Sequence, residues 1–234
     1  MPQLRQRQRG SHPSADARLL ARPYTPAMPG KPGLHRLGIG GRRETLLYVP
    51  EGYTPQQPAP LAVMLHGAGG QAQHGLDLLR RVADAAGIIL VAPASRASTW
   101  DVITGDYGPD VVLLDLALRQ VFERYAVDRA RIAVGGFSDG ASYALSLGLT
   151  NGDFFTHAIA FSPGFMAPPD QRGKPWLFIS HGTHDEVLPI EMCSRRIVPM
   201  LQQAEYQVTY REFDGPHTIP PAIVDAAVAW FTPR

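Results

Sequence analysis

From residue 45 onward, strand-length apolar runs alternate with helix-length amphipathic stretches, and this alternation constrains the fold more than any other feature. The predicted strands are residues 45–50, 61–67, 88–93, 131–137, 157–161, 176–182 and 207–213. The predicted helices are residues 76–86, 110–125, 139–149, 190–203 and 221–231. Because each parallel crossover needs a helix-sized connection, this order predicts an α/β fold with a mainly parallel sheet and helices on both faces.

The chain reads as one domain preceded by an arm. A length of 234 residues with 44% hydrophobic and 18% charged residues suits a single well-packed core. Residues 1–30 are rich in Arg, Gln and Pro and lack hydrophobic periodicity, which predicts an extended or disordered arm that is mostly solvated. Residues 31–234 are expected to form the main domain, and no insertion between its elements is long enough to be a large lid.

Charge and cysteine content narrow the choice of partner and compartment. Lys and Arg number 22 against 21 Asp and Glu, so no overall field favours nucleic acid or anionic membranes, and a small, nearly neutral partner is expected. Cys193 is the single cysteine, which excludes an internal disulfide and favours the cytoplasm. The first residues lack the apolar stretch of a signal peptide, and no apolar run approaches the roughly 20 residues of a membrane span.

The segment 136–140 reads Gly-Phe-Ser-Asp-Gly and carries the strongest chemical signal. It follows a predicted strand and precedes a predicted helix, which is the context that the G-x-S-x-G nucleophile turn requires. Glycine is needed there because strand and helix approach closely around a strained serine. The alternative is a Ser-Gly loop that merely caps a helix, and the context on both sides favours Ser138 as a nucleophile.

Two later loops contain the groups that would activate this serine. A serine hydroxyl needs a base to remove its proton, and the base needs an acid on its second ring nitrogen. Asp185 and His217 each follow a predicted strand, and the order Ser138, Asp185, His217 is typical of this fold. We therefore predict His217 as the base and Asp185 as its orienting acid. Asp214 is a weaker alternative because it lies only three residues from His217.

Other candidate groups near the acid are interpreted as structural. His181 and His184 flank Asp185, but no further ligands at metal-like spacing accompany them, so we expect loop packing and no metal. Cys193 lies in a helical pattern and is interpreted as a small buried residue rather than a nucleophile.

The segment 66–70 reads His-Gly-Ala-Gly-Gly and directly follows a predicted strand. A glycine-rich turn exposes backbone N–H groups, and in this fold one of them helps the residue after the nucleophile to bind the oxyanion. The predicted oxyanion donors are the N–H groups of Ala68 and Asp139.

Together with Ser-Thr-Trp-Asp at 98–101, His-Gly-Thr-His-Asp-Glu-Val-Leu-Pro at 181–189 and Gly-Pro-His at 215–217, these motifs resemble the phospholipase/carboxylesterase family of α/β-hydrolases. The resemblance covers residues 45–232, and it implies the same triad and oxyanion donors, with Trp100 near an acyl pocket. The chain departs from the usual family pattern after the serine, where Gln is common and Asp139 stands here.

These residues predict hydrolysis of small-molecule esters through an acyl-enzyme. The open site without a lid favours short- to medium-chain esters, thioesters are a further candidate substrate, and no cofactor is needed because the oxyanion hole stabilises the charge. Two alternatives stay open. One is a peptidase or amidase with the same triad, and the other is a binding protein that keeps this fold without activity.

Overall fold

The computed structural model describes residues 16–26, 28–39, 41 and 43–232, which contain an eight-stranded sheet. The strand order is β1-β2-β4-β3-β5-β6-β7-β8, and neighbouring strands from β4 to β8 run parallel. The strands are β1 (Gly33–Arg36), β2 (Thr45–Val49), β3 (Ala59–Leu65), β4 (Ile89–Pro93), β5 (Val127–Phe137), β6 (His157–Phe161), β7 (Trp176–Gly182) and β8 (Val208–Phe213). The predicted α/β fold with a mainly parallel sheet is confirmed.

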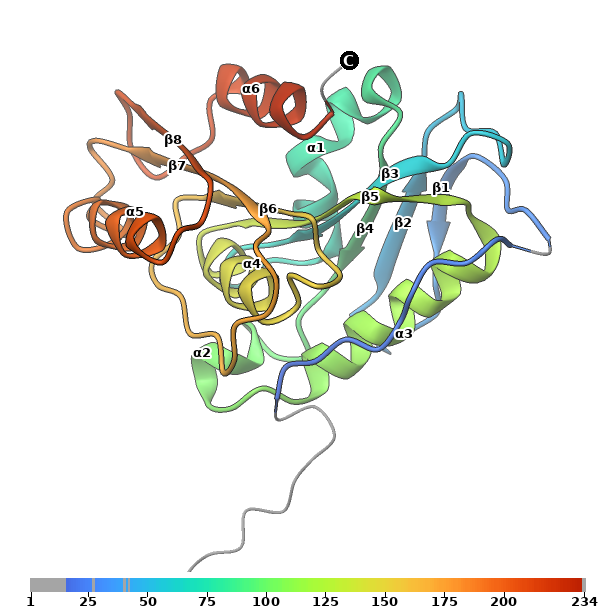
Figure 1. Ribbon diagram of the computed structural model, residues 1–234, viewed down its shortest axis with the longest axis horizontal. Helices are drawn as coiled ribbons and strands as arrows, with labels where there is room; N and C mark the ends of the chain where they lie inside the picture. The colour runs from blue at the N-terminus through green and yellow to red at the C-terminus, as the bar shows by residue number, and fades with distance from the viewer. Residues whose placement is uncertain (1–15, 27, 40, 42, 233–234) are drawn as a thin grey trace, which may run out of the picture.

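Helices cover both faces of the sheet, as predicted. They are α1 (Ala72–Ala86), α2 (Asp101–Thr104), α3 (Pro109–Arg124), α4 (Asp139–Thr150), α5 (Ser194–Gln203) and α6 (Pro221–Phe231). Figure 1 shows α1 and α6 on one side of the sheet and α3 and α4 on the other, and the buried side chains form one hydrophobic core with each group. Among the described helices, none is both long enough and apolar enough to cross a membrane.

The structure adds two short elements that the sequence pattern did not predict. Strand β1 has only four residues and pairs antiparallel with β2 at the edge of the sheet, so its side chains are only partly buried and give little hydrophobic signal. Helix α2 is a single turn with no fully buried residue. The predicted helix 190–203 begins later, at Ser194, because residues 190–193 form turns.

The described part of the N-terminal arm, residues 16–26, is extended and has one buried side. Residues 17, 19, 21 and 23 are buried and alternate with more exposed neighbours, so the prediction of a mostly solvated arm is wrong for that side. Leu19 is fully buried in the core that contains α3 and α4, and its N–H donates to Asn151 Oδ1 at 2.9 Å. The Arg18 guanidinium pairs with Asp153 at 2.7 Å. The sequence hides this alternation, because two of the buried residues are alanines and the exposed Leu20 is as apolar as the buried Leu19. Residues 1–15 of the predicted arm lie outside the described residues.

His157 at the start of β6 makes stability depend on pH. Its ring packs against Trp230 and Phe231, each with ring centroids 5.0 Å away, and burial lowers its pKa to about 4. Between about 4 and the ordinary value of 6.5, the unfolded chain therefore binds the proton more readily than the native protein does. His157 should therefore lower the free energy of unfolding by on the order of 2 kcal/mol as pH drops through this window. Asp110, whose pKa burial raises to about 6, acts in the opposite direction over the same pH range.

Urea denaturation at pH 4 to 7 tests this prediction, since His157→Phe keeps an aromatic ring and removes the titrating group. The difference in free energy of unfolding between the wild type and His157→Phe should change by that amount between pH 6.5 and 4. The difference between the wild type and His74→Gln, at an exposed histidine, should not change with pH. A slope identical in the wild type and His157→Phe would show that another group causes it.

Candidate active site

Ser138 lies on a tight turn between β5 and α4, at the carboxyl end of the sheet. Its backbone has φ 56° and ψ −121°, a left-handed conformation that costs energy for a residue with a side chain. A Cβ on Gly136 would lie 2.5 Å from the carbonyl carbon of Gly140, and a Cβ on Gly140 would lie 2.3 Å from Leu65 O. Both glycines of the motif are therefore required by close backbone approach, which holds Ser138 at the first turn of α4.

The structure brings Asp185 and His217 into direct contact. His217 Nδ1 lies 2.6 Å from Asp185 Oδ2, and the other carboxylate oxygen accepts the N–H groups of Val187 and Leu188 at 3.0 and 2.8 Å. Burial alone would raise the pKa of Asp185, but the hydrogen bonds from Leu188 N–H and His217 outweigh it and hold this pKa below its ordinary value. The carboxylate therefore stays ionised and fixes the proton of His217 on Nδ1, which leaves Nε2 able to accept a proton.

The alternative orienting acid, Asp214, faces away from this pair. Its Oδ1 lies 2.9 Å from His184 Nδ1, and the two side chains are 89% and 73% exposed. An exposed contact of this kind contributes little to stability. Of the two candidate acids, only Asp185 therefore contacts His217.

His217 also reaches the residue next to the predicted nucleophile. Its ring packs on Phe137 with centroids 4.6 Å apart, and Phe137 immediately precedes Ser138. No hydrogen bond joins the Ser138 hydroxyl to His217 in the described structure, and such bonds are often loose before substrate binds. The three predicted residues therefore converge at one end of the sheet, with Asp185 and His217 hydrogen-bonded and Ser138 one residue from the His217 contact.

The loops that carry the acid and the base are joined through their backbones. Thr183 N–H donates to Phe213 O and His184 N–H donates to Gly215 O, both at 2.9 Å. A Cβ on Gly182 would lie 2.4 Å from Gly215 O, so only glycine permits this approach. The backbone thus positions the imidazole against the carboxylate before any substrate is present.

A second Ser-His-Asp group lies behind the first and is closed to solvent. His181 Nε2 donates to the Leu188 carbonyl at 2.7 Å and also lies 3.2 Å from Asp185 Oδ2. Its Nδ1 is therefore unprotonated and accepts the Ser194 hydroxyl at 2.7 Å. Burial lowers the pKa of His181, and both His181 and Ser194 are 0% exposed. No ester can reach this serine, and the group instead supports Asp185 from the inside.

The glycine-rich loop lies against the nucleophile turn, as the oxyanion prediction requires. A Cβ on Gly67 would be 3.4 Å from Ser138 Cβ, and in the described residues the Ala68 N–H has no backbone acceptor. Asp139 is the first residue of α4, so its N–H has no acceptor within the helix. Gly69 N–H is held by Ser98 O at 2.7 Å. The arrangement leaves two free donors on segments that flank Ser138.

Trp100 is not on the surface of the site, so its predicted place at an acyl pocket needs correction. The indole is fully buried, stacks on Tyr143 with centroids 5.1 Å apart, and donates its N–H to His66 O at 2.9 Å. His66 Nε2 accepts the Ser95 N–H at 3.0 Å, which leaves its proton on Nδ1 toward Gly67 O. Trp100 thus supports the glycine-rich loop from beneath instead of contacting a substrate.

Sequence reasoning missed several side chains that hold the site together. The Thr99 hydroxyl donates to Asp139 Oδ2 at 2.6 Å, and the Ser142 hydroxyl accepts the Gly164 N–H at 2.9 Å. These partners are more than 20 residues apart, so no local pattern could have paired them. Within the described residues, no group of three or more His, Cys, Asp or Glu side chains is arranged to hold a metal.

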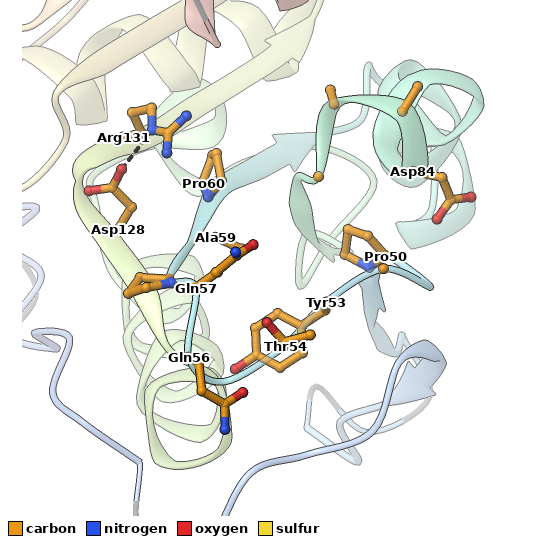
Figure 2. A pocket seen from close by; sticks show the side chains of 15 residues that line it. Pro50, Tyr53, Thr54, Gln56, Gln57, Ala59, Pro60, Asp84, Asp128 and Arg131 are labelled. Atoms are coloured by element: carbon orange, nitrogen blue, oxygen red, sulfur yellow. Dashed lines mark hydrogen bonds and ion pairs between the residues drawn. The ribbon is translucent and has the colours of Figure 1, made fainter. Parts of the chain in front are cut away.

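A cavity of about 810 Å³ lies at the opposite end of the sheet, away from Ser138. Figure 2 shows its lining, which includes Ala59 and Pro60 at the start of β3 and the Asp128–Arg131 ion pair near the start of β5. Ligands of open α/β sheets bind beyond the carboxyl ends of the strands, and this cavity is at the amino ends. It is therefore separate from the candidate active site.

The sheet order, the serine turn and the loops after β7 and β8 define an α/β-hydrolase fold. Solved structures with this fold include the fluorophosphonate-binding serine hydrolase F of Staphylococcus aureus, with a TM-score of 0.68, 16% identity and coverage of 88% of this chain and 100% of that one. A CE1 ferulic acid esterase from Anaeromyces mucronatus superposes with a TM-score of 0.64 at 19% identity, covering 81% of this chain and 84% of that one.

Residues 113–231 match the phospholipase/carboxylesterase family, and the chain belongs to that family. Feruloyl esterase C of Emericella nidulans is 30% identical over 161 residues, which are 64% of this chain and 57% of that protein. A probable feruloyl esterase C of Aspergillus oryzae is 29% identical over 171 residues, or 68% and 60% of the two chains. The chain thus spans less than two thirds of the length of these relatives.

Proposed function

We propose that the protein is a serine esterase in which Ser138, His217 and Asp185 hydrolyse carboxylic esters through an acyl-enzyme. The observation that carries this proposal is the 2.6 Å contact between His217 Nδ1 and the buried, ionised Asp185, beside a serine held on a strained turn. This combination is typical of an activated nucleophile.

The mechanism follows from the positions of the donors and acceptors. Ser138 Oγ attacks the ester carbonyl carbon while His217 Nε2 takes its proton, and the N–H groups of Ala68 and Asp139 bind the oxyanion. The intermediate collapses, and the alcohol leaves with the proton that His217 carried. Water then attacks the acyl-enzyme carbonyl carbon while His217 Nε2 takes a proton from it. His217 returns this proton to Ser138 Oγ as the carboxylic acid is released.

Apolar side chains around the site favour an uncharged, apolar acyl group. Phe137 immediately precedes Ser138, and its ring packs on His217. The Val187 N–H donates to the Asp185 carboxylate, and Val187 is 65% exposed. The feruloyl esterases among the relatives support aromatic acids as one acyl class, beside the short- to medium-chain esters and thioesters expected from the sequence. Turnover of p-nitrophenyl acyl esters, methyl ferulate, an acyl thioester and an aryl amide, measured side by side, separates these substrate classes.

Location in the cytoplasm stays a prediction, based on Cys193 as the single cysteine.

Labelling with a fluorophosphonate tests the proposal directly, because the probe reacts only with an activated serine. The wild type and Ser194→Ala are expected to be labelled, and Ser138→Ala is expected to show no labelling and no turnover of p-nitrophenyl acetate. Ser194→Ala is the matched control because that serine also hydrogen-bonds a histidine but is fully buried. A wild type that is neither labelled nor active would instead favour a binding protein, and labelling retained in Ser138→Ala would place the nucleophile elsewhere.

A further inference from the structure

The loop 95–100 contacts both segments that carry the predicted oxyanion donors. Its Ser98 carbonyl accepts Gly69 N–H at 2.7 Å, one residue beyond Ala68. On the other side, the Thr99 hydroxyl donates to Asp139 Oδ2 at 2.6 Å, and Thr99 is only 9% exposed. One short loop thus holds the two halves of the oxyanion hole in register with each other.

The hydrogen bond from Thr99 restrains a carboxylate that would otherwise interfere with oxyanion binding. Asp139 is the first residue of α4, where the free N–H groups and the helix dipole attract negative charge. The same N–H groups are needed for the negative charge that develops on the ester oxygen. A carboxylate free to turn toward them would compete with the oxyanion and repel it. The bond to Thr99 ties the carboxylate to a neighbouring loop instead.

We propose that Thr99 is a positioning residue of the oxyanion hole, which holds the Asp139 carboxylate away from the N-terminus of α4 so that the Asp139 N–H stays free to bind the oxyanion. This role rests on the proposed esterase function. It depends on both partners, because the hydroxyl matters only while residue 139 carries a charge to be restrained.

Thr99→Val keeps the shape of the side chain and removes the hydroxyl. We expect kcat for p-nitrophenyl acetate to fall about tenfold with KM changed less than twofold, since the lost interaction acts on the transition state. Thr99→Ser restores the donor and should recover most of kcat. Thr232→Val, which removes a comparable hydroxyl bond to Val228 O at the end of α6, is the matched control and should leave kcat unchanged.

A double-mutant cycle with Asp139→Asn separates this role from general packing. In the neutral background, Thr99→Val should lower kcat less than threefold, because no charge is released. Equal losses in both backgrounds, or no loss in Thr99→Val, would overturn the proposal. If Thr99→Val does not fold, Thr99→Cys offers a weaker donor of similar size and should lower kcat by an intermediate factor.

Fluorophosphonate labelling distinguishes a failure of the proposed Thr99 role from a failure of the proposed esterase function. A labelled, active wild type with an unaffected Thr99→Val refutes only the role of Thr99. An unlabelled and inactive wild type refutes the esterase function and this role together.

Discussion

His217→Ala is expected to lower kcat for p-nitrophenyl acetate by roughly 10⁴-fold or more, the loss seen when a triad base is removed. The physical reason is that the Ser138 hydroxyl then has no base to accept its proton. The Asp185 carboxylate also loses one of its hydrogen bonds, so a modest fall in Tm should accompany the loss. Stopped-flow or steady-state kinetics with thermal denaturation measure both.

His184→Ala is the matched control for this variant. It removes a histidine of the same region that pairs with Asp214 and is 73% exposed, so kcat should change less than about threefold. If His217→Ala kept more than a tenth of the wild-type kcat, or if His184→Ala were equally impaired, the assignment of the base would be wrong.

Gly140→Ala is expected to destabilise the protein by about 3 kcal/mol and to lower kcat about 10²-fold. A Cβ at this position would lie 2.3 Å from Leu65 O and 2.5 Å from His66 O, and both are backbone atoms that cannot rotate away. Either α4 or the glycine-rich loop must therefore shift, and both carry predicted oxyanion donors. Urea denaturation and kinetics on the same preparation report the two effects.

Gly148→Ala in the same helix separates this effect from a general cost of alanine. Its Cβ would meet side-chain atoms, Ala158 Cβ at 3.0 Å and Val134 Cγ1 at 3.3 Å, far from the serine. Alanine also has a higher helix propensity than glycine by about 1 kcal/mol, which offsets the crowding. The expected result is a stability change within about 1 kcal/mol and an unchanged kcat. Equal losses of activity in both variants would contradict the close-packing argument.

The class of fold could be predicted because strand and helix patterns are local. Apolar runs predicted β2 to β8 with shifts of a few residues, and the glycines around Ser138 predicted a tight turn that the 2.3 to 2.5 Å approaches explain. Strand β1 was not predicted, because an edge strand of four residues buries too few side chains to produce a hydrophobic pattern in the sequence. The buried side of residues 16–26 was missed for a different reason: two of its buried residues are alanines, and the exposed Leu20 masks the alternation.

The sequence by itself determined the order of the three predicted catalytic residues and placed each just after a strand, since in a parallel sheet those ends converge at one edge. Only the tertiary structure decided which acid faces His217, that Trp100 points into the core, and that Thr99 restrains Asp139. The physical reason is the sequence separation over which each kind of interaction acts. Periodicity and turn sterics act over a few neighbouring residues, whereas the direction of a side chain depends on segments that pack together from distant parts of the chain.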